Sequence, residues 1–250
     1  MDRSLLSDVG VIEASRSFVC IRTATYEDRE EVDFQKETFF GGEGDLRNFG
    51  YAVLAPDGKR KLKRSRRGPN FVYRDAKDMA ADLRRLADPY RKTANANKKS
   101  TALPAMKSVR LGLNVASCDG LPFVVVVGKT RRDLDGLQKK LAGAVWKKDL
   151  IGKFIFASTT EAKDLASIKG ATFSAGIMVI KPDAYGVKGT VITEIGLRAG
   201  ADKLEKTLLG VAAKFVRTAK SHRDHVRQGR RAGLEWKTEV PVPSRRRSRR

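Results

Sequence analysis

The stretch FSAGIMVIKPDAYGVKGTVITEI, residues 173–195, decides the fold of this chain. Two apolar, β-branched runs at 177–180 and 190–195 flank a turn that contains Pro182, Asp183 and Gly186. Proline fixes φ, aspartate bonds to its own backbone and glycine accepts a positive φ, so these residues are typical of turns. The stretch therefore predicts an antiparallel hairpin.

The same pattern occurs earlier, in FGYAVLAPDGKRKL at residues 49–62. Its segment GYAVLAPD, which begins at Gly50, matches GIMVIKPD, which begins at Gly176. Internal repetition indicates that the chain contains two copies of one architecture.

Hydrophobic spacing predicts the other elements of the first half. Leu5, Leu6, Val9 and Ile12 give a lead-in helix over residues 1–16. The nearly continuous apolar run at 18–21 indicates a strand over 17–25 that is covered on both faces. A helix at 28–40, the hairpin at 49–64 and a helix at 75–90 complete an order of β, α, β-hairpin, α.

The polar segment RKTANANKKST, residues 91–101, indicates a linker. After it we expect the order β-α-β-α-β-β-α, a mixed sheet with helices on both sides. Its predicted elements are a strand at 121–127, a helix at 130–146, a strand at 153–158, a short helix at 160–168, the hairpin and a helix at 202–216. The expected domains are 1–92 and 104–218, joined by a linker at 93–103 and followed by a basic, disordered tail at 219–250.

The tail begins with SHRDHVRQGRR, which either prolongs the last helix or belongs to the tail proper. VPVPSRRRSRR after it has too little apolar surface to offset the entropy of ordering, so we expect disorder. The formal charge of the 250 residues is +22, and two segments carry most of it. Residues 59–67 contribute +7 and residues 217–250 contribute +9.

No apolar run is long enough to span a bilayer, and the first residues show no secretory signal. We expect a soluble, cytoplasmic protein, although a cleaved mature form would look the same. Two cysteines about a hundred residues apart imply no disulfide framework. The oligomeric state is left open.

The order of elements, with paired late strands and a final amphipathic helix, resembles the thioredoxin-like superfamily. The second half resembles the whole fold and the first half a shortened version. In that family a Cys-x-x-Cys motif follows the first central strand, and a cis-proline before the hairpin faces it. Gly50 and Gly176 stand at the cis-proline position here. The dithiol positions hold Tyr26, Glu27, Asp28 and Arg29 in one half and Arg131, Arg132, Asp133 and Leu134 in the other.

Dithiol exchange needs an attacking thiolate and a resolving thiol, and neither copy has this pair at those positions. The resemblance therefore implies a non-catalytic binding or scaffold protein with a protein partner. Its expected surfaces are the loops at 25–28 and 128–132, beside Gly50 and Gly176.

Other candidate sites are weaker. Gly128-Lys129-Thr130 lacks the first glycine of a phosphate-binding loop, so Thr130 is expected to cap a helix. His222 and His225 are too few for a metal site, and we expect neither a metal nor a cofactor. Cys20 is expected to be buried and inert, and Cys118 to lie near the surface as a candidate reactive thiol.

Two alternatives stay open beside the scaffold hypothesis. One is a redox protein that uses a single cysteine, Cys118. The other is a protein that binds nucleic acid or another polyanion through its basic segments. The candidate residues for that contact are Lys59, Arg60, Lys61, Lys63, Arg64, Arg66, Arg67, Arg245, Arg246, Arg247, Arg249 and Arg250.

Overall fold

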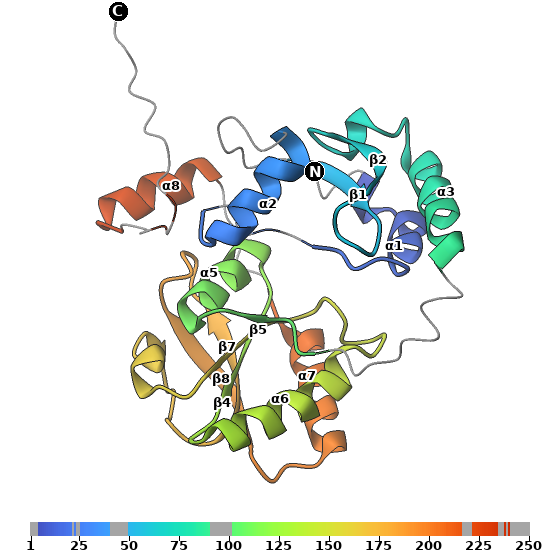
Figure 1. The fold of residues 1–250 in the computed structure, drawn as a ribbon. Coiled ribbons are helices and arrows are strands. Elements are labelled where there is room, and N and C mark those ends of the chain that lie inside the picture. The colour runs from blue at the N-terminus through green and yellow to red at the C-terminus, as the bar shows by residue number, and fades with distance from the viewer. Residues whose placement is uncertain are drawn as a thin grey trace, which may run out of the picture. The chain divides into compact units, whose positions relative to one another are not determined.

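The computed structural model divides into two compact units, Met1–Lys98 with Trp236–Arg250, and Lys99–Glu235 (Figure 1). We call them the first and the second unit. The structure describes residues 5–21, 23, 26–40, 50–90, 102–216, 222–234, 238 and 240. Most of the expected linker and residues 241–250 of the expected tail lie outside these ranges.

The second unit is built on a six-stranded mixed sheet. Three strands are parallel, and the late hairpin joins them antiparallel through β7, which pairs with β4. The short β6 pairs in parallel with β8 at one edge. In spatial order the strands are β3 (Ala105–Met106), β5 (Ile155–Thr159), β4 (Phe123–Val127), β7 (Gly176–Pro182), β8 (Gly189–Gly196) and β6 (Ile168–Lys169). The sequence-based prediction of a mixed α/β sheet flanked by helices is confirmed.

Helices cover both faces of this sheet (Figure 1). All five β4 side chains are buried, and successive ones point to opposite faces. Val124 and Val126 pack with α6 (Arg131–Val145) and α7 (Ala201–Lys214). Phe123, Val125 and Val127 pack with α5 (Val109–Asp119) and with Leu165 of the 3-10 turn η4 (Ala162–Leu165).

The hairpin expected at 173–195 is present as β7 and β8. Asp183 closes its turn, because its carboxylate accepts bonds from the backbone N–H groups of Tyr185 and Val187. Gly186 has a φ of 66° and lies against Asn114 of α5, where a Cβ would come within 2.6 Å of the Asn114 Cα. Both requirements exclude other residues at this position.

The first unit contains a two-stranded sheet and three α-helices among its described residues. The hairpin expected at 49–64 is present, and Asp57 closes its turn as Asp183 does in the other. Its core contains Val11, Ala14, Val53, Tyr73, Met79 and Leu83. The elements are η1 (Leu5–Ser7), α1 (Val9–Ser15), α2 (Arg29–Phe40), β1 (Tyr51–Leu54), β2 (Lys61–Arg66), η2 (Pro69–Phe71), α3 (Ala76–Ala87) and η3 (Asp88–Tyr90).

Two predictions for the first unit are wrong. Residues 18–21 form no strand, and Val19 and Ile21 are 82% and 75% exposed. Phe18 packs against the core of the first unit, whereas the other three residues of this run are exposed. The lead-in helix is present, but Leu5, Val11 and Ala14 are its buried side chains, whereas Val9 and Ile12 are exposed. The face of this helix that packs against the core therefore differs from the predicted face.

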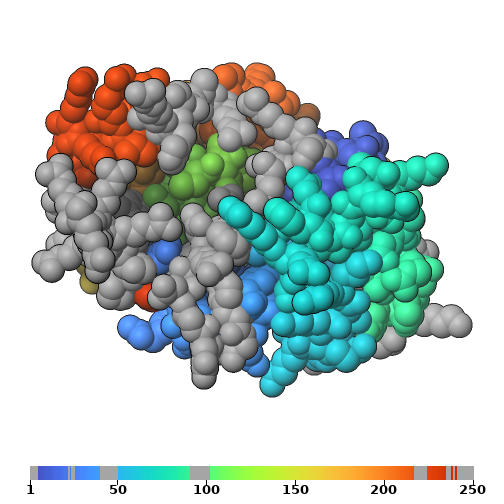
Figure 2. Space-filling view, turned by 90° about the horizontal axis from the view of Figure 1, so that it is seen from above, coloured from blue at the N-terminus to red at the C-terminus, as the bar shows by residue number. Residues whose placement is uncertain are grey.

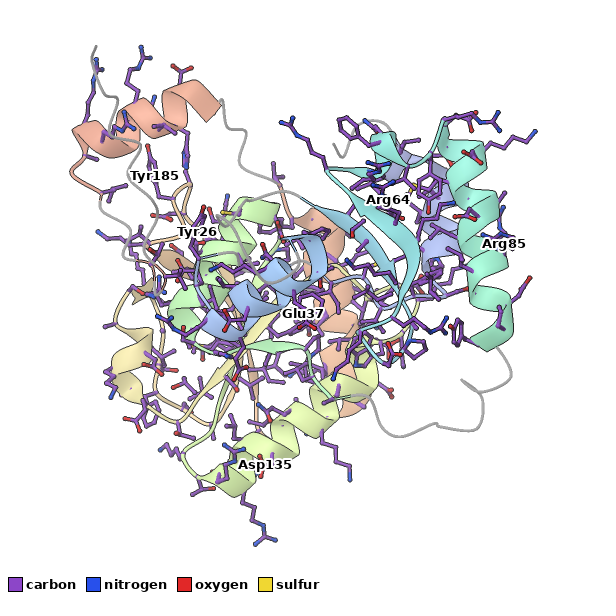
Figure 3. All side chains as sticks on the ribbon, turned by 45° about the horizontal axis from the view of Figure 1, so that its top comes forward. Tyr26, Glu37, Arg64, Arg85, Asp135 and Tyr185 are labelled. Carbon is purple, nitrogen blue, oxygen red and sulfur yellow. The ribbon has the colours of Figure 1, made fainter. Side chains whose placement is uncertain are left out.

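Two helices differ from the predicted set. Helix α5 was not predicted, although Ser108 caps its start and Gly120, with φ of 66°, ends it. Helix α8 (His222–Arg231) lies within the segment predicted as tail. The Tyr185 ring stacks on the His225 ring at 4.3 Å, and Gly229 is buried beside Tyr185 (Figure 3). The expectation of disorder from residue 219 is therefore wrong for residues 222–231.

No helix within the described ranges is long and apolar enough to cross a membrane.

Candidate functional site

Three loops of the second unit meet at one edge of its sheet. Val127, the last residue of β4, pairs with Thr159 at the end of β5 and with Gly176 at the start of β7. The Gly128 N–H also donates to the Thr159 carbonyl over 3.1 Å. We call residues 128–132, 159–161 and 172–176 the loop surface. It brings together the expected loop 128–132 and Gly176.

A capping box closes the start of α6 on this surface. The Asp133 N–H donates to Thr130 Oγ1 over 3.1 Å, and the Thr130 N–H and hydroxyl donate to Asp133 Oδ2. These bonds satisfy N–H groups that a helix start would otherwise leave unpaired. The expectation that Thr130 caps a helix is confirmed. The carboxylate of Asp133 also supplies the negative charge that the positive end of the helix dipole favours.

The two glycines of the loop surface permit close backbone packing. A Cβ on Gly128 would lie 2.7 Å from the backbone nitrogen of Leu134, so only glycine fits this turn into α6. A Cβ on Gly176 would lie 2.8 Å from the Ile195 carbonyl oxygen of β8. The described residues contain no cis peptide bond. Gly176 thus serves the pairing of β7 with β8.

The exposed side chains of the loop surface include three basic residues, one acid, Glu161, and one aromatic ring. Lys129 and Arg132 form no ion pair with any described residue, whereas Arg131 pairs with Asp135 over 3.2 Å (Figure 3). Phe173, just before β7, is 38% exposed. Leu134, the fourth of the expected dithiol positions, is buried in the core. The loop surface therefore presents to solvent an aromatic ring, Phe173, and two cations that form no ion pair with any described residue.

The first unit arranges its corresponding residues differently. Asp28 is buried and its carboxylate accepts from the Glu31 N–H over 3.1 Å, so it caps α2. Glu27 beside it is buried as well. Gly50 lies against the Phe39 ring, which belongs to the end of α2 remote from Arg29. The residues 26–29 and Gly50 are therefore not brought together as in the second unit.

Both cysteines are free and exposed. The expectation that Cys20 is buried is wrong, because the segment around it forms no strand within the core. Cys118 is exposed as expected, in the last turn of α5. At that end of a helix the backbone presents carbonyl groups and a negative partial charge. Neither thiol lies at the start of a described helix.

No group of three metal-ligating side chains occurs among the described residues. The ring of His225 is occupied by its stacking on Tyr185. His222 belongs to the same helix, α8.

The basic side chains of the hairpin in the first unit fall into two groups. Some are bound by neighbouring side chains, and others are exposed and form no ion pair with any described residue. Lys63 Nζ donates to Asp82 Oδ2 over 2.9 Å and lies 5.2 Å from the centre of the Tyr73 ring. Arg60 donates to the Tyr90 hydroxyl over 2.6 Å. The side chains of Lys59, Lys61, Arg64 and Arg66 are exposed and form no ion pair with any described residue. The cyan segment that contains this hairpin lies at the surface in Figure 2. Arg67 is exposed too. The expected polyanion residues of the tail, Arg245–Arg247, Arg249 and Arg250, lie outside the described residues.

Asp82 is the acid that fixes this hairpin to α3. Burial favours its neutral form, but bonds from Lys63 and Arg85 outweigh burial and hold the pKa of Asp82 below its usual value. Arg64 on β2 and Arg85 on α3 are labelled in Figure 3. Asp57 is also engaged, and bonds from the backbone N–H groups of Lys59 and Arg60 lower its pKa.

Sequence reasoning missed the exposure of Phe173 in the loop surface and of Phe71 just after the basic hairpin. Phe173 lies directly before a predicted strand, and its burial depends on contacts that the sequence pattern does not reveal. Phe71 follows Gly68-Pro69, a turn signal that could have suggested exposure.

No protein-family model, no curated protein and no solved structure matches this chain.

Proposed function

We propose that the second unit is a thioredoxin-like domain without dithiol chemistry, which serves as a binding module. The sheet order β3-β5-β4-β7-β8 supports this assignment, with three parallel strands followed by an antiparallel hairpin. So does the position of α6 directly after the central β4 and of α7 after the hairpin. For the first unit, the proposal of a shortened copy rests on its matching hairpin and on α2 and α3.

The capping box of Thr130 and Asp133 is the observation that carries the proposed loss of chemistry. It occupies the helix start that an attacking thiolate would need, and it places a carboxylate there. The same loop surface carries an exposed ring, Phe173, and two cations that form no ion pair with any described residue, Lys129 and Arg132. The loop surface therefore binds a peptide segment of a partner protein that carries apolar and acidic side chains.

A reduction assay tests the proposed absence of dithiol chemistry. We expect dithiothreitol to reduce the disulfides of insulin at the same rate with and without the wild-type chain. Cys118→Ser and Cys20→Ser should behave identically. A wild-type rate that falls in Cys118→Ser would support the single-cysteine alternative instead.

Peptide display tests the proposed binding surface. Peptides selected on the full chain should be rich in apolar and acidic residues, with affinities measured by fluorescence anisotropy. Phe173→Asp should weaken the best peptide by about tenfold or more, as loss of one buried aromatic contact predicts. Ile151→Asp is the matched control, because Ile151 is 44% exposed just before β5, at the opposite end of the sheet. Equal losses in both variants would contradict the proposal.

A second candidate function is the binding of a polyanion by the first unit. The unpaired cations Lys59, Lys61, Arg64 and Arg66 favour it, because nearby acids are already engaged. The affinity for heparin should fall as the salt concentration rises. The double variant Arg64→Gln with Arg66→Gln should show a weaker dependence of this affinity on salt. Lys139→Gln with Lys203→Gln removes the same charge from the second unit and serves as the control. Identical salt dependence in both double variants would contradict this candidate.

A further inference from the structure

The side chain of Phe71 is exposed to solvent, although the turn η2 that carries it is fixed by buried residues and backbone hydrogen bonds. It is 65% exposed, whereas Gly68, Pro69 and Tyr73 around it are buried. The Phe71 N–H donates to the Gly68 carbonyl over 3.0 Å, and the Tyr73 N–H donates to the Pro69 carbonyl over 2.9 Å. The ring is thus presented by a fixed backbone, so its use in binding requires little loss of backbone freedom.

The strand before this turn directs its cations outward. In the pairing of β1 with β2, Tyr51 lies opposite Arg66, Val53 opposite Lys63 and Leu54 opposite Lys61. Between each two successive pairs, β2 therefore contains one residue more than β1. Such bulges increase the twist of the strand and change the direction of its side chains. Lys61, Arg64 and Arg66 are exposed. A bulged edge with charged side chains opposes the addition of another strand, so a peptide that extends the sheet does not suit it.

No described acidic side chain forms an ion pair with Lys61, Arg64 or Arg66. Asp57 is engaged by backbone N–H groups of its own turn, and Asp82 by Lys63 and Arg85. Only Gly68, Pro69 and Asn70 separate Arg67, the last cation of the basic run, from Phe71. The open face of the Phe71 ring therefore follows closely on Lys61, Arg64 and Arg66, which form no ion pair with any described residue.

We propose that β2 and η2 bind single-stranded nucleic acid, with Arg64 and Arg66 on phosphates and a base stacked on Phe71. This rests on the polyanion candidate and names its ligand. Arginine presents a planar fork that matches a phosphate, and every base offers a face to an aromatic ring. Binding is independent of sequence, since the described hairpin offers charge and stacking but no groove that reads base edges.

The test uses the full chain and a labelled oligomer of twelve deoxythymidines, followed by fluorescence anisotropy at several salt concentrations. Heparin is the polyanion without bases, and vesicles of phosphatidylcholine with phosphatidylserine represent an anionic membrane. Phe71→Ala removes the ring, and Phe71→Trp restores a stacking surface. Phe173→Ala is the matched control, because it removes an exposed ring from the second unit. Thermal melting verifies that each variant is folded.

We expect Phe71→Ala to weaken oligomer binding by about tenfold, the loss of one base–aromatic stack. Phe71→Trp should restore it, and heparin affinity should not change in either. Arg64→Gln with Arg66→Gln should lower the slope of log affinity against log salt by about 1.4, at ~0.7 for each phosphate.

Four results would overturn the proposal. If Phe71→Ala costs no more than Phe173→Ala, the ring does not stack on a base. If Phe71→Ala weakens vesicle binding and not oligomer binding, the ligand is a membrane surface. If the arginine variants change neither heparin nor oligomer binding, the polyanion candidate fails together with this inference. If they change both while Phe71→Ala changes neither, the polyanion candidate stands and only the stacking is refuted.

Discussion

Lys63 and Arg64 are neighbours in one basic run, but their side chains have opposite environments. Lys63 turns toward Asp82 and the Tyr73 ring, whereas Arg64 is exposed without an ion pair among the described residues. The charge count predicted a basic surface here but could not separate these two residues. That separation depends on the bulges of β2 and on α3, which a run of like charges in the sequence does not reveal.

Asp82 makes the first unit sensitive to acid. A carboxylate whose pKa is lowered by folding stabilises the fold above its unfolded pKa, about 3.9, and this contribution is lost as pH falls through the lower folded value. We expect Asp82→Asn to reduce the free energy of unfolding by about 1–3 kcal/mol at pH 7, because Lys63 and Arg85 lose their charged acceptor. The deficit should shrink toward pH 3.

Urea unfolding followed by circular dichroism at pH 7 and pH 3 measures this difference. Asp149→Asn is the control, because Asp149 is exposed and forms no ion pair among the described residues. A deficit for Asp82→Asn that is the same at both pH values would argue against this account of the Asp82 pKa.

Helix α8 shows how an element can depend on one contact. Its ten residues are strongly basic, and a helix of this length is marginal in water on its own. The stacking of His225 on Tyr185 and the buried Gly229 hold it against the turn between β7 and β8. The composition of this segment predicted a tail because the partner ring lies far away in the sequence.

We expect Tyr185→Ala to release α8 and Tyr185→Phe to retain it, since phenylalanine keeps the stacking face. Limited trypsin digestion with mass spectrometry should detect faster cleavage after Arg227, Arg230 and Arg231 in Tyr185→Ala. Cleavage at Lys163, an exposed site in η4, gives the reference rate. If both tyrosine variants are cleaved like the wild type, this contact does not hold the helix.

Local chemistry explains which elements the sequence could predict. Both hairpins carry an aspartate that bonds to its own turn, at Asp57 and Asp183, and such signals act within a few residues. The run at 18–21 has strand composition, yet no neighbouring element pairs with it among the described residues. Pairing partners are distant in sequence, so composition alone could not show their absence.

The whole molecule contains separate cores for its two units. The first unit packs α1 and α3 around Val53 and Tyr73, and the second packs helices on both faces of β4. The candidate site depends on this level of organisation. The loop after β4 could be located from the sequence, whereas the position of Gly176 beside it is set by the register between β4 and β7.

Separate cores predict separate responses to a cavity. Leu83→Ala should speed amide hydrogen exchange in residues 50–90 and leave β4 unchanged, because Leu83 is buried only in the first core. Leu137→Ala should do the reverse. Each removes about 2–5 kcal/mol of packing and transfer free energy. Mass spectrometry of pulse-labelled peptides resolves the two regions, and faster exchange in both regions for either variant would refute the separation.

The sequence FVVVV of β4 is the centre of the sheet, but it is also uncharged and rich in β-branched residues. Such a segment aggregates readily whenever it is unpaired. Its partner β5 ends at Thr159 and its partner β7 at Pro182, so during synthesis the ribosome releases β4 well before either can cover it. Three basic residues follow this strand immediately, Lys129, Arg131 and Arg132. Charges that flank an apolar strand discourage the association of nascent chains. Neutralising these three cations should therefore lower the yield of recovered protein, even if the stability of the folded state does not change.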